Sequence, residues 1–199
     1  MRLKRLGLCA VLAAVSAGAS TITYTFQGTA SGTAGTTGFT DEAFTITFTN
    51  DTGNIVNPSC CSGDISSGSA TPASVFIDTL GTGMLLDTQA VFVNPSPLEL
   101  NIGIWHYNEP DWLDLVTSVA ETYDLKSSVG PVTPSAAFSS VQMSGHSLSS
   151  SLGNLAFTSV SDVTFSADLQ STAVPEPSTL ALLCAGLALI GTGIRRKTR

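Results

Sequence analysis

The sequence predicts an all-β body, a two-sheet β-sandwich of jelly-roll or immunoglobulin-like type, between two terminal segments of different character. Several short stretches alternate apolar and polar residues with a period of two, which is typical of half-buried strands. Gly, Pro, Asn, Ser and Asp separate these stretches and favour turns. We therefore expect about eight to ten short strands and at most one helix.

The clearest strand predictions lie near the two ends of the body. Residues 21–26 and 44–49 alternate Ile, Tyr or Phe with Thr, and residues 163–169 alternate Val, Phe, Ala and Leu with polar residues. Threonine is β-branched and suits the solvent-facing side of a sheet. Further strands are predicted at 74–80, 84–93, 98–104, 137–143 and 152–159.

The remaining stretches of the body are predicted to be turns or irregular. The range 28–38 is rich in Gly, Thr and Ser and predicts a loop or a weak edge strand, and Gly81–Gly83 predicts a turn. Residues 50–72 predict a long surface loop with room for a short strand at 55–56. Residues 123–127 look extended.

The range 105–124 is compatible with two structures. Asp111 could cap a short helix in which Leu113, Val116 and Ala120 share one face. The same residues could form a loop that carries Trp105 and Trp112. Periodicity alone leaves both alternatives open.

The N-terminal segment Met1–Ala19 has the features of a secretory signal peptide. Arg2, Lys4 and Arg5 precede an apolar run, and Ala17-Gly18-Ala19 provides small residues at the cleavage position. We expect cleavage before Ser20, so that the body enters an oxidising, exported environment.

Charge is distributed very unevenly along the chain. Seven of the eight Lys and Arg residues lie in the two terminal segments. Between Ser20 and Val174 there are 14 Asp and Glu residues and one Lys, Lys126, a net charge of −13. Such a body repels phosphate backbones, so nucleic acid is not expected as a partner.

Cysteines and histidines do not form a recognisable site in the sequence. Cys60 and Cys61 are neighbours, and they predict either a loop with two thiols, a strained vicinal disulfide or a bridge between chains. His106 and His146 are not part of any known metal or catalytic motif. We therefore expect no metal, no cofactor and no catalytic residues.

The C-terminal segment combines a rigid linker, an apolar run and a basic end. Ser178–Ile194 is uncharged and 17 residues long, about 25 Å as a helix, which is at the short end for a membrane span. Arg195, Arg196, Lys197 and Arg199 follow it and favour a cytoplasmic C-terminus. A transmembrane helix is therefore predicted in preference to a core helix.

Val174-Pro175-Glu176-Pro177-Ser178, the apolar run and Arg195-Arg196-Lys197 together resemble the PEP-CTERM sorting signal. This tail is also labelled an ice-binding-protein C-terminal domain, a label that belongs to the tail and does not predict ice binding. The resemblance implies export in a Gram-negative bacterium that makes exopolysaccharide. It also implies a transient membrane anchor and cutting by an exosortase, a cysteine transpeptidase, at or near Pro175, Glu176 and Pro177. The body more loosely resembles the N-terminal parts of such proteins, which implies no activity.

The predicted organisation has five parts: a signal peptide at 1–19, a β-sandwich at 20–170, a linker at 171–177, a transmembrane helix at 178–194 and a basic cytoplasmic tail at 195–199. The leading hypothesis is a non-catalytic structural or adhesive protein of the cell surface or the exopolysaccharide matrix. The alternative is a carbohydrate-binding protein or enzyme in which Trp105, Glu109, Asp111 and Trp112 converge on one cleft. A third hypothesis is permanent retention in the membrane without cutting.

Overall fold

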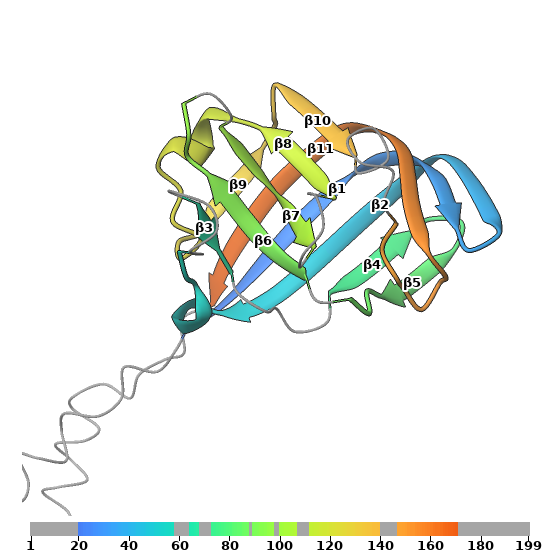
Figure 1. Ribbon diagram of the computed structural model, residues 1–199, viewed down its shortest axis with the longest axis horizontal. Helices are drawn as coiled ribbons and strands as arrows, with labels where there is room; N and C mark the ends of the chain where they lie inside the picture. The colour runs from blue at the N-terminus through green and yellow to red at the C-terminus, as the bar shows by residue number, and fades with distance from the viewer. Residues whose placement is uncertain are drawn as a thin grey trace, which may run out of the picture. The chain divides into compact units, whose positions relative to one another are not determined.

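The computed structural model of the chain describes residues 20–57, 64–67, 73–87, 89–97, 100–106, 112–139 and 147–170. These residues form two antiparallel sheets (Figure 1). The all-β prediction with two sheets is confirmed. Contacts group Ser20–Ser171 into one compact unit with its own hydrophobic core. The predicted signal peptide, linker, transmembrane helix and basic tail lie outside the described residues.

The larger sheet, sheet A, has the strand order β5-β4-β2-β1-β11-β9. Its three long strands are its centre: β1 and β2 form a hairpin, and β11 pairs antiparallel with the other side of β1. The strands are β1 (Thr21–Ala34), β2 (Thr37–Asp51), β4 (Ser74–Ile77), β5 (Gly81–Met84), β9 (Val129–Val132) and β11 (Leu155–Gln170).

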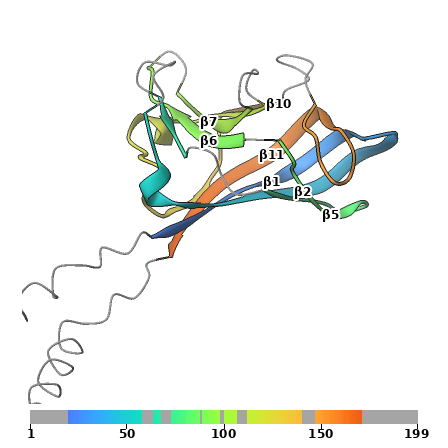
Figure 2. The same ribbon diagram turned by 60° about the horizontal axis from the view of Figure 1, so that its bottom comes forward.

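The smaller sheet, sheet B, has the order β10-β8-β7-β6-β3 and covers one side of sheet A (Figure 2). Its strands are β3 (Ile65–Ser66), β6 (Gln89–Asn94), β7 (Asn101–His106), β8 (Leu113–Val116) and β10 (Ala136–Ser139). Alternate residues of both sheets fill the space between them. Ile22, Tyr24 and Phe26 of β1 and Val91 and Val93 of β6 are fully buried there.

One end of sheet A closes on itself. Leu148 bridges to Leu155 at the start of β11, and Ser150 bridges to Leu85 just after β5. Because β5, β4, β2, β1 and β11 are already neighbours in that order, the hydrogen bonds run around a complete circuit at this end. The first and last strands of the circuit are therefore not left as bare edges there.

Aromatic side chains fill the closed end and connect it to the sandwich. The ring of Phe157 lies 5.0 Å from Phe44, 5.9 Å from Phe39 and 4.8 Å from Trp112, measured between ring centroids. Trp112 directly precedes β8, so this cluster links sheet B to the closed part of sheet A.

Two glycine-containing stretches predicted as a loop and a turn are strands. The range 28–38, predicted as a loop or a weak edge strand, belongs to two inner strands, because β1 continues to Ala34 and β2 begins at Thr37. The long ladder with β2 and β11 supplies hydrogen bonds that offset the poor strand propensity of Gly. Gly81–Gly83 belongs to β5, and the turn lies one step earlier, at Asp78–Leu80.

Of the two alternatives for 105–124, the helix between Asp111 and Ala120 does not form, and Trp105 lies on β7 and not in a loop. Leu113 and Leu115 face the core as alternate residues of β8, and only a short 3₁₀ turn, Ser118–Glu121, follows. Residues 124–127 form a turn with Leu125 at a φ of 59°, not an extended segment. The two strands predicted at 152–159 and 163–169 are one strand, β11, with Asp162 at a φ of 51° inside it.

Candidate functional site

The outer side of sheet A carries two regular rows of uncharged side chains, which we call the hydroxyl face. Each row crosses five strands in the order β5, β4, β2, β1, β11. The registers give Met84, Ser74, Thr47, Thr25 and Ser166 for the first row, and Thr82, Phe76, Thr45, Gln27 and Thr164 for the second. Their strand neighbours Ile22, Ile46 and Val75 point the other way into the core.

The polar groups of the hydroxyl face are not used by the fold. Among the described residues, no side chain of the two rows forms a hydrogen bond with another protein group, whereas several serines and threonines elsewhere do. Each hydroxyl is a donor and an acceptor. The rows therefore present a pattern of polar groups that is open to an external partner.

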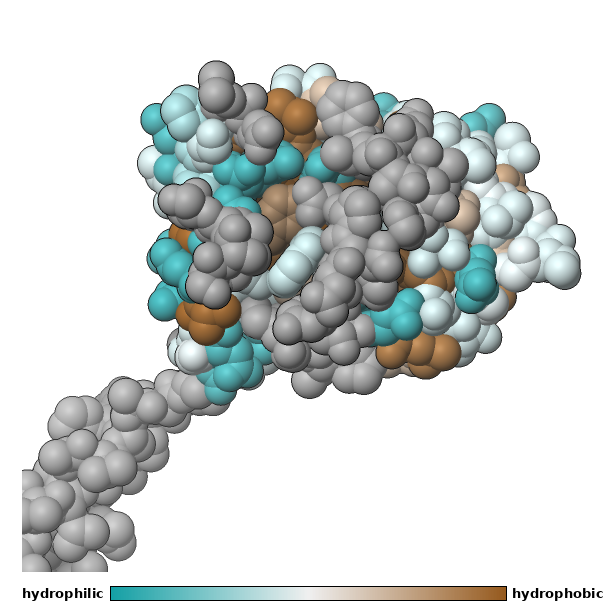
Figure 3. All heavy atoms as spheres, viewed as in Figure 1, coloured by the Kyte–Doolittle hydropathy of each residue, from teal (hydrophilic) through white to brown (hydrophobic). Residues whose placement is uncertain are grey.

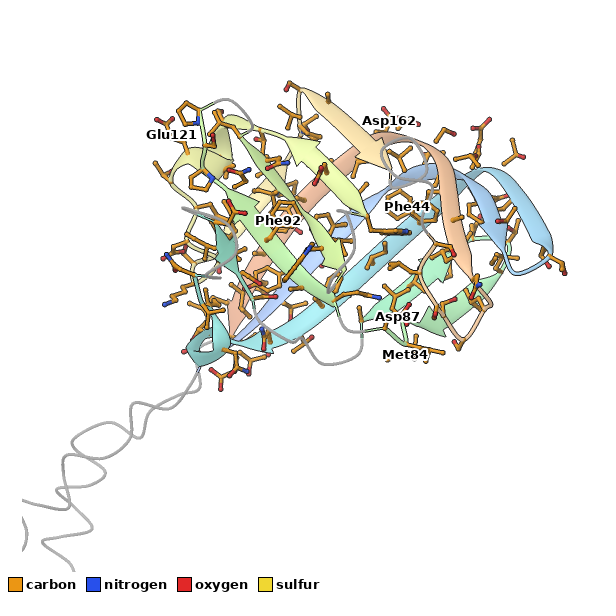
Figure 4. The ribbon with its side chains drawn as sticks, viewed as in Figure 1. Phe44, Met84, Asp87, Phe92, Glu121 and Asp162 are labelled. Carbon is orange, nitrogen blue, oxygen red and sulfur yellow. The ribbon has the colours of Figure 1, made fainter. Side chains whose placement is uncertain are left out.

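Two apolar residues interrupt this polar pattern at its β4–β5 margin. Phe76 is 39% exposed and Met84 is 40% exposed, and they point outward from adjacent strands. Met84 lies at the lower right in Figure 4, where Figure 3 shows an apolar surface patch. The sequence identified this strand but not the exposure of Phe76, although its place between the inward-facing Val75 and Ile77 predicts it.

The two tryptophans of the predicted carbohydrate site do not share a surface. Trp112 is 1% exposed and packs inward on Phe157 of sheet A. Trp105 follows the fully buried Ile104 on β7, so strand alternation directs it to the outer side of sheet B. Glu109 and Asp111 lie outside the described residues. The described part of the predicted site is thus divided between the two sides of sheet B.

The outer side of sheet B holds a tightly packed row across β6, β7 and β8. Phe92 pairs with Gly103, and Gly103 pairs with Asp114. Phe92, labelled near the centre of Figure 4, is 7% exposed and Asp114 is 3% exposed. A Cβ added at Gly103 would lie 2.6 Å from both the Phe92 ring and the Asp114 carboxylate. The glycine is needed because these two side chains meet above its Cα atom.

Three side chains carry buried polar atoms that, among the described residues, make no hydrogen bond. Gln89 is 4% exposed and neither atom of its amide has a partner. Asn101 Oδ1 and Trp112 Nε1 are in the same situation. Unsatisfied buried groups weaken a fold. At these three positions the fold therefore loses stability, because buried polar atoms lack hydrogen-bond partners.

Two buried tyrosines hold the turn after the 3₁₀ segment. Tyr24 Oη donates to Leu125 O at 2.7 Å, and Tyr123 Oη donates to Ser127 O at 3.0 Å. Burial raises the pKa of both phenols far above the usual range, and the Asp124 carboxylate adds to the effect. Both phenols therefore stay protonated and act as structural donors.

No group of three or more His, Cys, Asp and Glu side chains that could hold a metal ion lies together in the described parts of the chain. His146, Cys60 and Cys61 fall outside those parts, and so does the His106 side chain. No described helix has the length and apolar character needed to cross a bilayer, and the predicted span 178–194 lies outside the described residues.

The predicted sorting residues Pro175, Glu176 and Pro177 and the basic residues Arg195, Arg196, Lys197 and Arg199 also lie outside the described residues. A family model described as the PEP-CTERM protein-sorting motif matches residues 173–197. No curated protein matches the chain, and no solved structure does. The family match confirms the resemblance seen in the tail.

Proposed function

We propose, from the PEP-CTERM sorting motif that this chain carries at residues 173–197, that the protein is a structural or adhesive component of the cell surface or the exopolysaccharide matrix. The motif implies export and transit in a membrane-anchored form. In the proposed pathway an exosortase-type transpeptidase removes the tail, and the body is then released to the surface or the matrix. The role is non-catalytic.

The chemistry of the tail supports this pathway. Pro175 and Pro177 favour an extended backbone, which is the conformation that a protease-like active site can accommodate. Glu176 offers one charge for recognition. The uncharged run 178–194 and the basic residues after it would hold this segment at a fixed height above the membrane.

The composition of the body supports a location outside the cell. Its 14 acidic residues and single Lys give it a charge of −13, which keeps a released protein soluble and limits self-association at low salt. Its three long paired strands form a rigid unit that needs no partner chain for its core. These are suitable properties for a passive component of a hydrated matrix.

The processing step is tested in the native host with an epitope inserted at an exposed position of the body, such as the turn at Asp78–Leu80. We expect the mature protein to end near Pro175–Pro177 by mass spectrometry and to leave the inner membrane. Replacing Pro175, Glu176 and Pro177 by Ala should leave the full-length chain in the membrane. A tail that stays intact in the unaltered protein would support permanent anchoring and contradict the proposed release.

The matrix role is tested separately by deleting the gene. Biofilm cohesion or cell-surface properties should change, and the chain with its intact tail should restore them. The variant with Pro175, Glu176 and Pro177 replaced by Ala is the matched control, because it keeps the body but should not be delivered. If the deletion strain is indistinguishable from its parent in these assays, the structural or adhesive role is wrong even where sorting is correct.

A further inference from the structure

We propose that the hydroxyl face binds a neutral polysaccharide, with the sugar chain lying along the two rows and one ring against Phe76. This inference rests on the proposed function, because it names the contact surface and the partner of a matrix protein. Three features of the face support it: the arrangement of polar groups, the exposed aromatic ring and the absence of charge from the rows.

The rows have the dimensions of an extended ligand. Neighbouring strands of a sheet are about 4.8 Å apart, and residues on the same side of a strand repeat at about 6.8 Å. Five strands therefore give each row a length of about 19 Å. The centre of this surface is stiff because β1 pairs with long strands on both of its sides.

The chemistry of the rows matches that of a sugar chain. Seven hydroxyl side chains and the amide of Gln27 can exchange hydrogen bonds with sugar hydroxyls, and none is occupied within the described fold. Phe76 supplies an apolar ring surface for the C–H side of a pyranose. The face thus offers an apolar contact and spaced hydrogen-bonding groups, which match the apolar C–H side and the hydroxyls of a sugar ring.

The charge distribution favours a neutral polysaccharide over a charged one. The rows contain no acidic or basic residue, although the body around them has a charge of −13. Acidic residues flank the rows on both sides along the strands: Asp168 lies two residues from Ser166, and Asp162 and Asp78 lie two residues from Thr164 and Phe76. An acidic polysaccharide would be repelled by the body as a whole, and the rows offer no cation to compensate.

Two other surfaces of the body are less suited to binding a polysaccharide. On the outer side of sheet B, Phe92 is 7% exposed and Asp114 is 3% exposed, and Trp105 is only partly exposed. Leu86 is 66% exposed but stands outside the rows, and its backbone is held by Ser149. The hydroxyl face combines exposure, order and neutrality in one place.

The test uses the purified body, Ser20–Ser171, which has a complete core of its own. Binding is measured by sedimentation with insoluble cellulose, β-1,3-glucan and starch, and by affinity electrophoresis with soluble neutral glucans and with alginate. We expect binding to at least one neutral polymer, little dependence on salt and no binding to alginate.

Two variants locate the site, each with a matched control. Phe76→Ser and Thr25→Lys should each weaken binding at least tenfold. Val56→Ser, at an apolar residue 49% exposed and away from the rows, and Thr122→Lys, at an exposed residue beside the 3₁₀ turn, should bind like the unaltered body. Thermal unfolding of all four variants verifies that loss of binding is not loss of fold.

Several outcomes would overturn the inference. The inference is wrong if the face variants bind as well as their controls, or if the body binds alginate alone or none of the polymers. It is also wrong if the face variants alter self-association of the body and leave polysaccharide binding unchanged. If the chain is sorted correctly and supports the matrix, but the face variants bind normally, the hydroxyl face is not the binding surface. The proposed function is unaffected by that result.

Discussion

Thr21, the first residue of β1, is paired with Gln170, the last residue of β11, across the ladder that joins the two strands. The predicted signal-peptide cut lies just before Ser20, and the Pro-Glu-Pro motif begins five residues after Gln170. Both predicted cuts therefore remove chain from the same end of the body. Neither touches a residue that the sheets need.

A circular permutant tests this closeness of the ends. Paired residues of antiparallel strands have Cα atoms about 5 Å apart, so a short Gly-rich linker should join 170 to 21 without strain. With new ends placed in the turn between Ala34 and Thr37, the permutant should keep the far-UV spectrum and cooperative unfolding of the body. A control cut in the same turn without the linker should be less stable. A permutant that does not fold would contradict the pairing of Thr21 with Gln170.

Replacing Phe157 by Ala should destabilise the body by about 3–5 kcal/mol, because it leaves a cavity in a large aromatic cluster. Phe157 contacts Phe39 and Phe44 of sheet A and Trp112 of sheet B. Denaturant unfolding followed by tryptophan fluorescence measures the change. Ser159→Ala, at an exposed position of the same strand, is the control and should stay within about 0.5 kcal/mol of the unaltered body.

Gly103→Ala should cost about 1–3 kcal/mol, since the added methyl group would overlap the Leu113 carbonyl oxygen, the Phe92 ring and the Asp114 carboxylate. Gly130→Ala is the matched control, because a Cβ there meets no atom within 4 Å. Its stability should be unchanged or slightly higher. Equal effects of the two substitutions on the free energy of unfolding would mean that the Phe92–Gly103–Asp114 row is not packed as described.

Gln89→Met should raise the free energy of unfolding by about 1 kcal/mol, because it replaces a buried amide that has no hydrogen-bond partner with an apolar side chain of similar size. Gln170→Met, at an exposed residue, should have little effect. A Gln89→Met variant less stable than the unaltered body would show that a water molecule or another group satisfies the amide in solution.

The stability of the body should fall as the pH rises above about 10, the ordinary pKa of tyrosine. Burial raises the pKa of Tyr24 and Tyr123 in the folded state, so above this pH the unfolded chain has lost protons that the folded chain retains. The stabilisation is complete below the unfolded pKa and decreases toward the folded pKa. Unfolding curves measured between neutral and alkaline pH should show this slope, and Tyr24→Phe should reduce it. Normal tyrosinate titration of the folded body would contradict the burial.

Local alternation was sufficient to predict the strands that bury one side against the core. Ile22, Phe26, Phe44 and Phe48 are buried where the period of two predicts, and the threonines between them face outward. The hydroxyl face is therefore predictable in composition. Its two-row geometry is not, because the registers of β1 with β2 and of β1 with β11 depend on pairing over long sequence separations.

Sequence reasoning failed where tertiary contacts overrode local preference. Gly32 weakens a strand on its own, yet in β1 it allows Ala156 of the neighbouring β11 to approach closely. The apolar residues Leu113 and Val116 fit a helical period, but pairing with β7 makes Leu113 and Leu115 the inward residues of a strand. Trp112, which precedes this strand, departs from its alternation and packs inward on Phe157, away from the side on which Trp105 lies.

The position of β11 also determines how the body responds to tension. A pull on the C-terminal segment enters the body at Gln170, and β11 is held between β1 and β9. Ladder hydrogen bonds lie perpendicular to the strands, so a force along β11 loads many of them in shear, and they must break together before the strand can slide. A terminal strand peeled sideways from a sheet would release its bonds one at a time. While its C-terminal segment is anchored, the body is thus expected to resist a force directed along β11.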